Sequence, residues 1–123
     1  MTKRKLLLAE DDELLAGLLH FRLEKGGYEV KLSRNGKEVK EYLAQTLPDI
    51  IVSDIMMPYF SGMELIDYVR NELGSKVPII IISSAGNEEN VLTAFELGAN
   101  DFISKPVSPS ELMVRLAREL KKL

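Results

Sequence analysis

The sequence contains no cysteine and only one histidine. Without cysteine there can be no disulfide, no zinc–thiolate centre and no cysteine nucleophile, and one histidine is too few for a multi-histidine metal site. No apolar run approaches the roughly 18 residues that a membrane-spanning helix needs. The apolar stretch after the basic N-terminal residues covers only 6–9, which is too short for a secretory signal. These absences predict a cytoplasmic protein that does not enter a membrane.

Two common phosphate-binding motifs are also missing. The chain has no G-x-x-x-x-G-K-[ST] sequence, hence no P-loop, and no G-x-G-x-x-G sequence, hence no dinucleotide fingerprint. The net charge of −3, from 16 basic and 19 acidic residues, argues against direct nucleic-acid binding. With 123 residues, no repeat and no low-complexity tract, the sequence predicts one domain over residues 1–123.

What the chain does contain is a series of short apolar runs. Continuous runs of this length are typical of strands that are buried on both faces, as in a parallel sheet. One segment alternates between apolar and polar residues, as a half-exposed edge strand would. The predicted strands are 6–9, 28–32, 50–52, 79–82 and 101–104.

Helical patterns fill the gaps between the predicted strands. Two of the helices open with a serine followed three residues later by a glutamate, which is the capping-box pattern. In the first helix a wide stripe of leucines is expected to face the core: Leu14, Leu15, Leu18, Leu19 and Leu23. Strict alternation of strands and helices predicts a parallel sheet with helices on both faces. The predicted helices cover about 13–25, 36–45, a stretch from Ser61, 88–97 and a stretch from Ser108.

Polar side chains follow four of the five predicted strands. In a parallel sheet with helices on both faces, ligands bind outside the carboxyl ends of the strands. The side chains that follow neighbouring strands should therefore meet in one crevice. The four strand ends read Glu10-Asp11-Asp12, Ser53-Asp54, Ser83-Ser84 and Ser104-Lys105.

This set of side chains favours a magnesium site. Clustered carboxylates repel one another, and a divalent cation removes that conflict. Oxygen ligands without cysteine or histidine favour Mg²⁺ or Mn²⁺ over zinc, and Mg²⁺ readily shares phosphate oxygens. Lys105 would then act as a point charge on a phosphoryl group. The alternative for a single residue is a helix cap, which Asp11 or Asp12 could supply to the next helix.

Other phosphate chemistries fit less well. A flavin site needs a phosphate-accepting turn after the first strand, whereas this turn is acidic. Phosphatases of the haloacid dehalogenase type place a second aspartate two residues after the nucleophile, but Asp54 is followed by Ile55 and Met56. A Mg²⁺-dependent phosphohydrolase acting on outside substrates stays open as an alternative, and so does a module that only binds protein partners.

Four segments, in order and spacing, resemble the receiver domain of two-component response regulators. They are the first strand with its acidic turn (6–12), the segment that starts at the expected phosphoacceptor (54–62), the fourth strand (77–85) and the fifth strand with its Lys-Pro end (98–106). The similarity extends over essentially the whole chain. It implies an α/β fold of the (βα)5 flavodoxin-like type, a doubly wound five-stranded parallel sheet with strand order 2-1-3-4-5.

The resemblance also implies a role for each acidic residue. Asp54 matches the aspartate that becomes phosphorylated. Glu10 and Asp11 match the acidic pair, of which Asp11 binds the metal directly and Glu10 binds it through water. Asp54 and the backbone carbonyl of Met56 complete the protein ligands of Mg²⁺, for which Mn²⁺ could substitute.

Three further residues match the catalytic and switching machinery. Lys105 matches the lysine that contacts the phosphoryl group, and its peptide bond to Pro106 is expected to be cis. Ser83 matches the hydroxyl that hydrogen-bonds the phosphoryl group in the active state. Phe102 matches an aromatic residue that moves between two rotamers, so that Ser83 and Phe102 form the implied switch.

The implied function is a phosphorylation-dependent signalling switch. A sensor histidine kinase or a histidine phosphotransfer protein would supply the phosphoryl group, and the chain would catalyse only its own phosphorylation and dephosphorylation. The expected readout face consists of 88–97, 101–104 and the last helix, and a homodimer could form there. Glu111 and Arg115 lie one helical turn apart on that face. They fit either an interchain contact or an ordinary intrahelical pair. Tyr59-Phe60 is expected to be either an exposed kinase contact or a partly buried pair.

Overall fold

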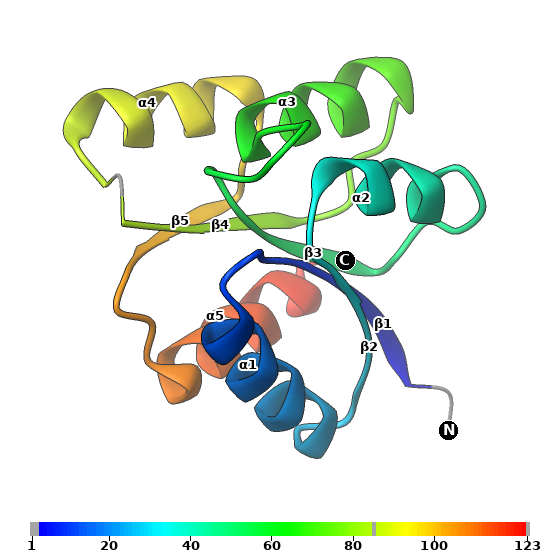
Figure 1. Ribbon diagram of the computed structural model, residues 1–123, viewed down its shortest axis with the longest axis vertical. Coiled ribbons are helices and arrows are strands. Elements are labelled where there is room, and N and C mark those ends of the chain that lie inside the picture. Colours follow the sequence, from blue (N-terminus) through cyan, green and yellow to red (C-terminus); the bar gives the residue numbers. More distant parts are fainter. Residues whose placement is uncertain (1–2, 85, 123) are drawn as a thin grey trace.

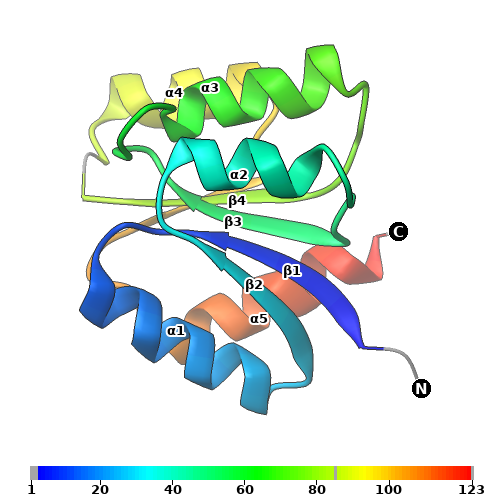
Figure 2. The same cartoon turned by 45° about the vertical axis from the view of Figure 1, so that its right-hand side comes forward.

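The computed structural model describes residues 3–84 and 86–122. Five strands alternate with five helices, and the third helix ends in a wider, π-helical turn, η1. Figures 1 and 2 show a central sheet between two layers of helices. The elements are β1 (Arg4–Ala9), α1 (Glu13–Lys25), β2 (Tyr28–Ser33), α2 (Gly36–Leu43), β3 (Ile50–Asp54), α3 (Gly62–Asp67), η1 (Tyr68–Glu72), β4 (Ile79–Ser83), α4 (Glu88–Leu97), β5 (Asp101–Ser104) and α5 (Pro109–Lys121).

The five strands are all parallel and lie in the order β2-β1-β3-β4-β5. This confirms the predicted flavodoxin-like topology. The second strand, β2, lies on one side of β1, and the later strands β3, β4 and β5 lie on the other side. The strand order therefore reverses beside β1 and β3, where a doubly wound sheet opens a crevice at its carboxyl edge.

Alternating side chains of the three central strands build two separate cores. Leu7, Ile51 and Ile81 face α2, α3 and α4, whereas Leu8 and Val52 face α1 and α5. All of these side chains are fully buried. Because both faces of the sheet are covered, the strands read as continuous apolar runs. Within the described residues, no helix is both long enough and apolar enough to cross a bilayer.

Side-chain caps fix where the helices begin. Ser61 and Glu64 form the predicted reciprocal capping box at the start of α3. At α5 only half of the predicted box is present, because Ser108 accepts from the Glu111 backbone while the Glu111 carboxylate pairs with Arg115. The serine hydroxyl therefore caps α5, and the glutamate serves a different contact.

The predicted leucine stripe of α1 is wrong in part. Leu19 and Leu23 are buried, but Leu14 is 89% exposed and Leu18 is 48% exposed. The helix packs through a narrower face than its apolar residues cover, so that the outer part of the stripe stays on the surface together with Phe21. The exposed set Leu14, Leu18 and Phe21 is called the α1 apolar stripe below.

Element boundaries differ from the predicted ones where neighbours decide them. β1 starts two residues early because Arg4 pairs with Tyr28 in β2, and β3 continues to Asp54, which pairs with Ile82. The second helix stops at Leu43 and not at residue 45. Such ends depend on pairing partners that a local pattern does not contain.

Candidate functional site

The sheet places the predicted site residues at one edge. Asp54 is the last residue of β3 and lies opposite Ile82, and Ser83 lies opposite Ser104 on β5. Lys105 and Glu10 directly follow β5 and β1. Since neighbouring strands are about 5 Å apart, these four chain segments deliver their side chains to the crevice that the topology opens.

Lys105 is the centre of this cluster. Its ammonium nitrogen Nζ lies 2.6 Å from Asp54 Oδ2 and 2.9 Å from Glu10 Oε1. Glu10 is fully buried and Asp54 is buried, whereas the lysine side chain keeps some contact with solvent. One cation therefore joins two buried carboxylates from different strands.

The pKa values of Glu10 and Lys105 are both shifted by burial and by their charged neighbours. Burial raises the pKa of Glu10, and the nearby negative charge of Asp54 raises it further, against the opposing effect of Lys105. Burial also lowers the pKa of Lys105, but its contacts with Asp54 and Glu10 outweigh burial and leave that pKa above its ordinary value. Lys105 is therefore held as a cation, while Glu10 has too little positive charge around it.

The acidic turn after β1 divides its tasks between two aspartates. Asp12 caps α1, because its carboxylate accepts from the backbone N–H groups of Leu14 and Leu15. Asp11 is exposed and belongs to the acidic cluster, in which carboxylate oxygens of Glu10, Asp11 and Asp54 all lie within 4.8 Å of one another. The helix-cap alternative thus applies to Asp12 and leaves Asp11 beside the site.

The residues present fit a magnesium ion. Glu10 Oε1 is buried and, within the described residues, accepts no well-directed hydrogen bond, although Lys105 lies at ion-pair distance. Carboxylate oxygens of three residues lie together, Lys105 pairs with two of those residues, and the candidate ligand atoms are all oxygens. A hard divalent cation would satisfy both the excess negative charge and the unbonded oxygen.

Met56 and Ser83 are bonded to residues of this cluster, whereas Phe102 lies on β5. The Met56 backbone N–H donates to Asp54 Oδ1 over 3.2 Å. Ser83 is fully buried, and its backbone carbonyl accepts from the Lys105 N–H over 2.9 Å. Phe102 is partly buried and packs against the core that contains Ile51 and Ile81. The roles expected for the Met56 carbonyl, the Ser83 hydroxyl and the Phe102 rotamers stay predictions, and the Lys105–Pro106 peptide bond is cis as predicted.

The loop between β3 and α3 separates the predicted aromatic pair. Phe60 is buried and packs so closely on α2 that a Cβ atom at Gly36 would overlap it. Tyr59 is 85% exposed and has a φ of 71°, a left-handed conformation that is unfavourable for a bulky residue. One aromatic residue anchors the loop, and the other projects from its rim.

The charges on α5 pair within the chain. Arg115 donates to Glu111 and to Asp101, each over 2.8 Å, and Arg118 lies 3.6 Å from Asp101. The intrahelical interpretation of Glu111 and Arg115 is therefore what the structure shows, and β5 joins the same network.

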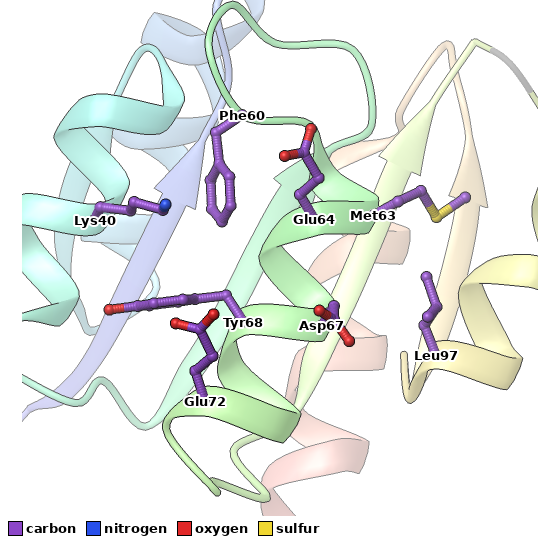
Figure 3. Close-up of a pocket in the computed structure, with 8 residues that line it drawn as sticks. All are labelled: Lys40, Phe60, Met63, Glu64, Asp67, Tyr68, Glu72 and Leu97. Carbon is purple, nitrogen blue, oxygen red and sulfur yellow. The ribbon is translucent and has the colours of Figure 1, made fainter.

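A second depression lies away from the acidic cluster, across the outer surface of α3 (Figure 3). It has a volume of about 380 Å³. Lys40 points toward Phe60 and Tyr68, and its ammonium lies 4.7 Å and 5.5 Å from the two ring centroids. The protein's own lysine thus occupies the aromatic part of this depression. The lining residues are Lys40, Phe60, Met63, Glu64, Asp67, Tyr68, Glu72 and Leu97.

Sequence reasoning did not identify Arg70, which makes an extensive set of contacts. It lies on η1 and donates five hydrogen bonds to two other chain segments, 75–77 before β4 and 98–100 between α4 and β5. A single arginine on a helix ordinarily predicts an exposed charge. The sequence shows that the helical pattern ends before Gly74, close to Arg70. That ending does not indicate which groups Arg70 would contact.

The strand order and the acidic carboxyl edge define, as a class, a doubly wound α/β domain whose ligand site lies at the carboxyl ends of its strands. Comparison with known proteins then places the chain within that class. Residues 6–117 match the family described as response regulator receiver domain. The chain belongs to this family and is the receiver domain of a two-component response regulator.

Individual relatives agree with this assignment. The chain is 36% identical over 121 residues to "Probable transcriptional regulator ycf27" of Guillardia theta; the match covers 98% of the chain and 47% of that protein, so the chain spans about half the length of this relative. The receiver domain of the Francisella response regulator 1452 is 31% identical, with a TM-score of 0.91 and coverage of 97% and 98%. The BeF3-activated receiver domain of DrrB is 27% identical, with a TM-score of 0.88 and coverage of 98% and 99%.

Proposed function

We propose that Asp54 accepts a phosphoryl group from a histidine of a partner protein, with Mg²⁺ bound beside it. Phosphorylation then changes the surface formed by α4, β5 and α5. The observation that carries the proposal is the contact of Lys105 with Asp54 and Glu10, with Asp11 in the same cluster. A scaffold has no structural need for three carboxylates around one lysine at its ligand-binding edge.

The chain's own residues would act by position and charge. An Asp54 carboxylate oxygen forms a bond to phosphorus as the phosphorus–nitrogen bond of the donor histidine breaks, and the departing imidazole keeps that electron pair. Lys105, already 2.6 Å from Asp54, then shares its charge with the oxygens of the transferred group. Before transfer, and against the effect of burial, its contacts with Asp54 and Glu10 raise the pKa of Lys105 and favour its charged form.

Asp11, Asp54 and the Met56 carbonyl would hold the metal ion directly, and Glu10 would hold it through water. When bound, Mg²⁺ supplies positive charge that neutralises the transferring oxygens, and Mn²⁺ could replace it. In hydrolysis, water adds to phosphorus as the bond to Asp54 breaks, and inorganic phosphate leaves. The chain is therefore proposed to process only its own phosphoryl group and not to act as a turnover enzyme.

A sensor histidine kinase or histidine phosphotransfer protein is the proposed donor. The α1 apolar stripe begins two residues after Asp12, beside the acidic cluster, and its members Leu14, Leu18 and Phe21 project into solvent. An exposed apolar helix face next to the reacting carboxylate suits an apolar surface of a protein donor better than a small molecule. We place this exchange in the cytoplasm.

The proposed readout uses Ser83 and Phe102 to connect the phosphoryl group with the α4–β5–α5 surface. The Ser83 hydroxyl would bond the phosphoryl group, and the loop after β4 and the Phe102 ring would follow. Leu92, Phe95 and Val114 are exposed on α4 and α5. This apolar surface would support a homodimer through α4, β5 and α5, and we assign the domain no direct nucleic-acid contact.

The direct test incubates the chain with Mg²⁺ and acetyl phosphate and measures the intact mass. The account predicts a gain of one phosphoryl group that needs Mg²⁺ and disappears in Asp54→Asn. Asp67→Asn is the matched control, because Asp67 is an exposed aspartate on α3, and it should keep the gain. A gain that survives Asp54→Asn would refute the proposal, and sustained release of phosphate from small phosphoesters would favour a hydrolase.

The donor surface can be tested separately. Phe21→Ser should slow transfer from an autophosphorylated histidine kinase that phosphorylates the wild-type chain, by about tenfold. Phosphorylation by acetyl phosphate should stay unchanged, because the small donor does not need the α1 apolar stripe. Equal loss with both donors would contradict this assignment.

A further inference from the structure

We propose that Arg70 holds the C-terminal end of α4 as a fixed pivot. Any rearrangement that starts at Asp54 would then be confined to the N-terminal half of α4 and the loop before it. The inference rests on the proposed phosphorylation switch and adds to it a positioning residue at the opposite edge of the sheet. It arises from the unequal way in which the two ends of α4 are held.

Arg70 uses all of its donors. Nε and Nη2 donate to the Gly98 carbonyl over 3.0 Å and 2.8 Å, and Nη1 donates to the carbonyls of Ser75 and Val77 over 3.0 Å and 2.7 Å. Nη2 also donates to Asn100 Oδ1 over 3.0 Å. A guanidinium has five N–H groups, so this side chain is fully engaged. It joins η1, the segment before β4 and the turn between α4 and β5.

The turn between α4 and β5 lets the Arg70 side chain come very close to the backbone at Gly98. Gly98 has a φ of 117°, which favours glycine, and a Cβ atom there would lie only 2.9 Å from Arg70 Nε. Asn100 secures the next step, because its N–H donates to the Ile79 carbonyl and its side-chain oxygen accepts from the Ile79 N–H, both over 2.8 Å. The turn after α4 is thereby bonded to both η1 and β4.

The apolar contacts of α4 are also concentrated at this end. The structure describes every residue of α4, and Ala94 is the single buried one among them. Leu97 packs against the same core, and Figure 3 shows it beside Met63 in the space between α3 and α4. Both anchors lie in the second half of the helix.

The N-terminal end of α4 is more exposed. Glu88, Glu89 and the preceding Gly86 and Asn87 are all exposed. The Asn87 side chain caps the helix locally by accepting from the Asn90 N–H. Segments with few buried apolar contacts open at lower free energy than segments with many. A change at Ser83, three residues before Gly86, should therefore propagate into the first half of α4 and stop where Arg70 holds the chain.

The test is hydrogen–deuterium exchange on the full chain with Mg²⁺, with and without beryllofluoride as the phosphoryl mimic. In the wild type, the amides of 86–91 should change their exchange rate by about tenfold on adding beryllofluoride, and the amides of 94–100 by less than about twofold. The pivot is overturned if both halves of α4 respond equally. No response anywhere would overturn the proposed function and the pivot with it.

Arg70→Lys provides the second arm. Lysine keeps the charge but has only three donors in a different geometry, so several carbonyl contacts are lost. In this variant the beryllofluoride-dependent change should extend into 94–100, whereas Arg22→Lys, an exposed arginine of α1, should behave as the wild type. A purely structural role would raise exchange at 94–100 equally with and without beryllofluoride, and that result would refute the pivot. Should Arg70→Lys fail to fold, Asn100→Ala tests the same turn.

Discussion

Each edge of the sheet contains a partly buried cation, and the two cations have partners of different charge. At the carboxyl edge, Lys105 is paired with the carboxylates of Asp54 and Glu10. At the amino edge, Arg70 donates to neutral carbonyls and an amide oxygen, and burial lowers its pKa. In the proposed function, Lys105 exchanges its anionic partners for a phosphoryl group, whereas Arg70 holds backbone carbonyls in place.

The residues around the two cations also differ in how well their groups are satisfied. The carboxyl edge contains the buried Glu10 carboxylate beside Asp54 and the left-handed Tyr59, both of which cost free energy. The amino edge satisfies Arg70 and pairs Asn100 with Ile79 in both directions. The amino edge therefore stabilises the fold. The carboxyl edge contains groups that lower stability, and it is the edge to which we assign the chemistry.

The largest expected effect lies at the amino edge. Arg70→Met should lower the free energy of unfolding by about 3–5 kcal/mol, because several carbonyls lose their donor. Chemical denaturation measures this loss. Phosphorylation of the folded variant by acetyl phosphate should stay within about twofold of wild type. A loss below about 1 kcal/mol would remove the contrast between the two edges.

Lys105→Met should have a smaller effect on stability and a larger effect on chemistry. Without Mg²⁺, two neighbouring carboxylates lose their counter-ion, and the free energy of unfolding should fall by about 1–3 kcal/mol. Added Mg²⁺ should restore most of this loss, and phosphorylation should slow by about 100-fold. Denaturation curves at two Mg²⁺ concentrations decide, and a loss that Mg²⁺ does not reverse would contradict the proposed metal site.

Glu10→Gln should stabilise the metal-free chain by about 1 kcal/mol, since it removes a buried charge whose burial Lys105 offsets only in part. Burial first, then repulsion from Asp54, raises the folded-state pKa of Glu10 above 4.5. Stability from its protonated form is fully present below that ordinary pKa and is lost as the pH rises through the folded-state value. The advantage of the variant in thermal melts should therefore grow from acidic to neutral pH. The exposed Glu96→Gln is the control, and a destabilised Glu10→Gln would refute the charge argument.

The smallest effect is expected at Tyr59. Tyr59→Gly should raise the free energy of unfolding by about 0.5–1 kcal/mol, because glycine adopts the left-handed backbone without strain and the exposed ring loses little contact. Thermal melting measures the change. A variant less stable than wild type would mean that the Tyr59 ring stabilises the fold. It would contradict the claim that backbone strain at Tyr59 destabilises the carboxyl edge.

The fold and the acidic edge were predictable because their signals are local. Apolar runs, caps and strict alternation identified the elements, and the carboxyl ends of parallel strands necessarily share an edge. The meeting of Asp54, Glu10 and Lys105 follows from that topology. The resemblance supplied what local pattern cannot, namely the strand order and the role expected of each site residue.

The remaining features depend on contacts between distant segments. Leu14 and Leu18 have the pattern of core residues, yet the helix packs on a different face. The exposure of Tyr59 and the burial of Phe60 depend on how closely the loop meets Gly36. Arg70 finds carbonyls up to 28 residues away in the chain, and no periodicity indicates such partners.

The most direct test of the central claim is a crystal structure of the chain with Mg²⁺ and beryllofluoride. The account predicts the ion about 2.0–2.1 Å from oxygens of Asp11 and Asp54. It also predicts beryllofluoride on the Asp54 carboxylate, with the Lys105 ammonium turned onto a fluorine. A cation bound elsewhere, or an unmodified Asp54 still paired with Lys105, would contradict it.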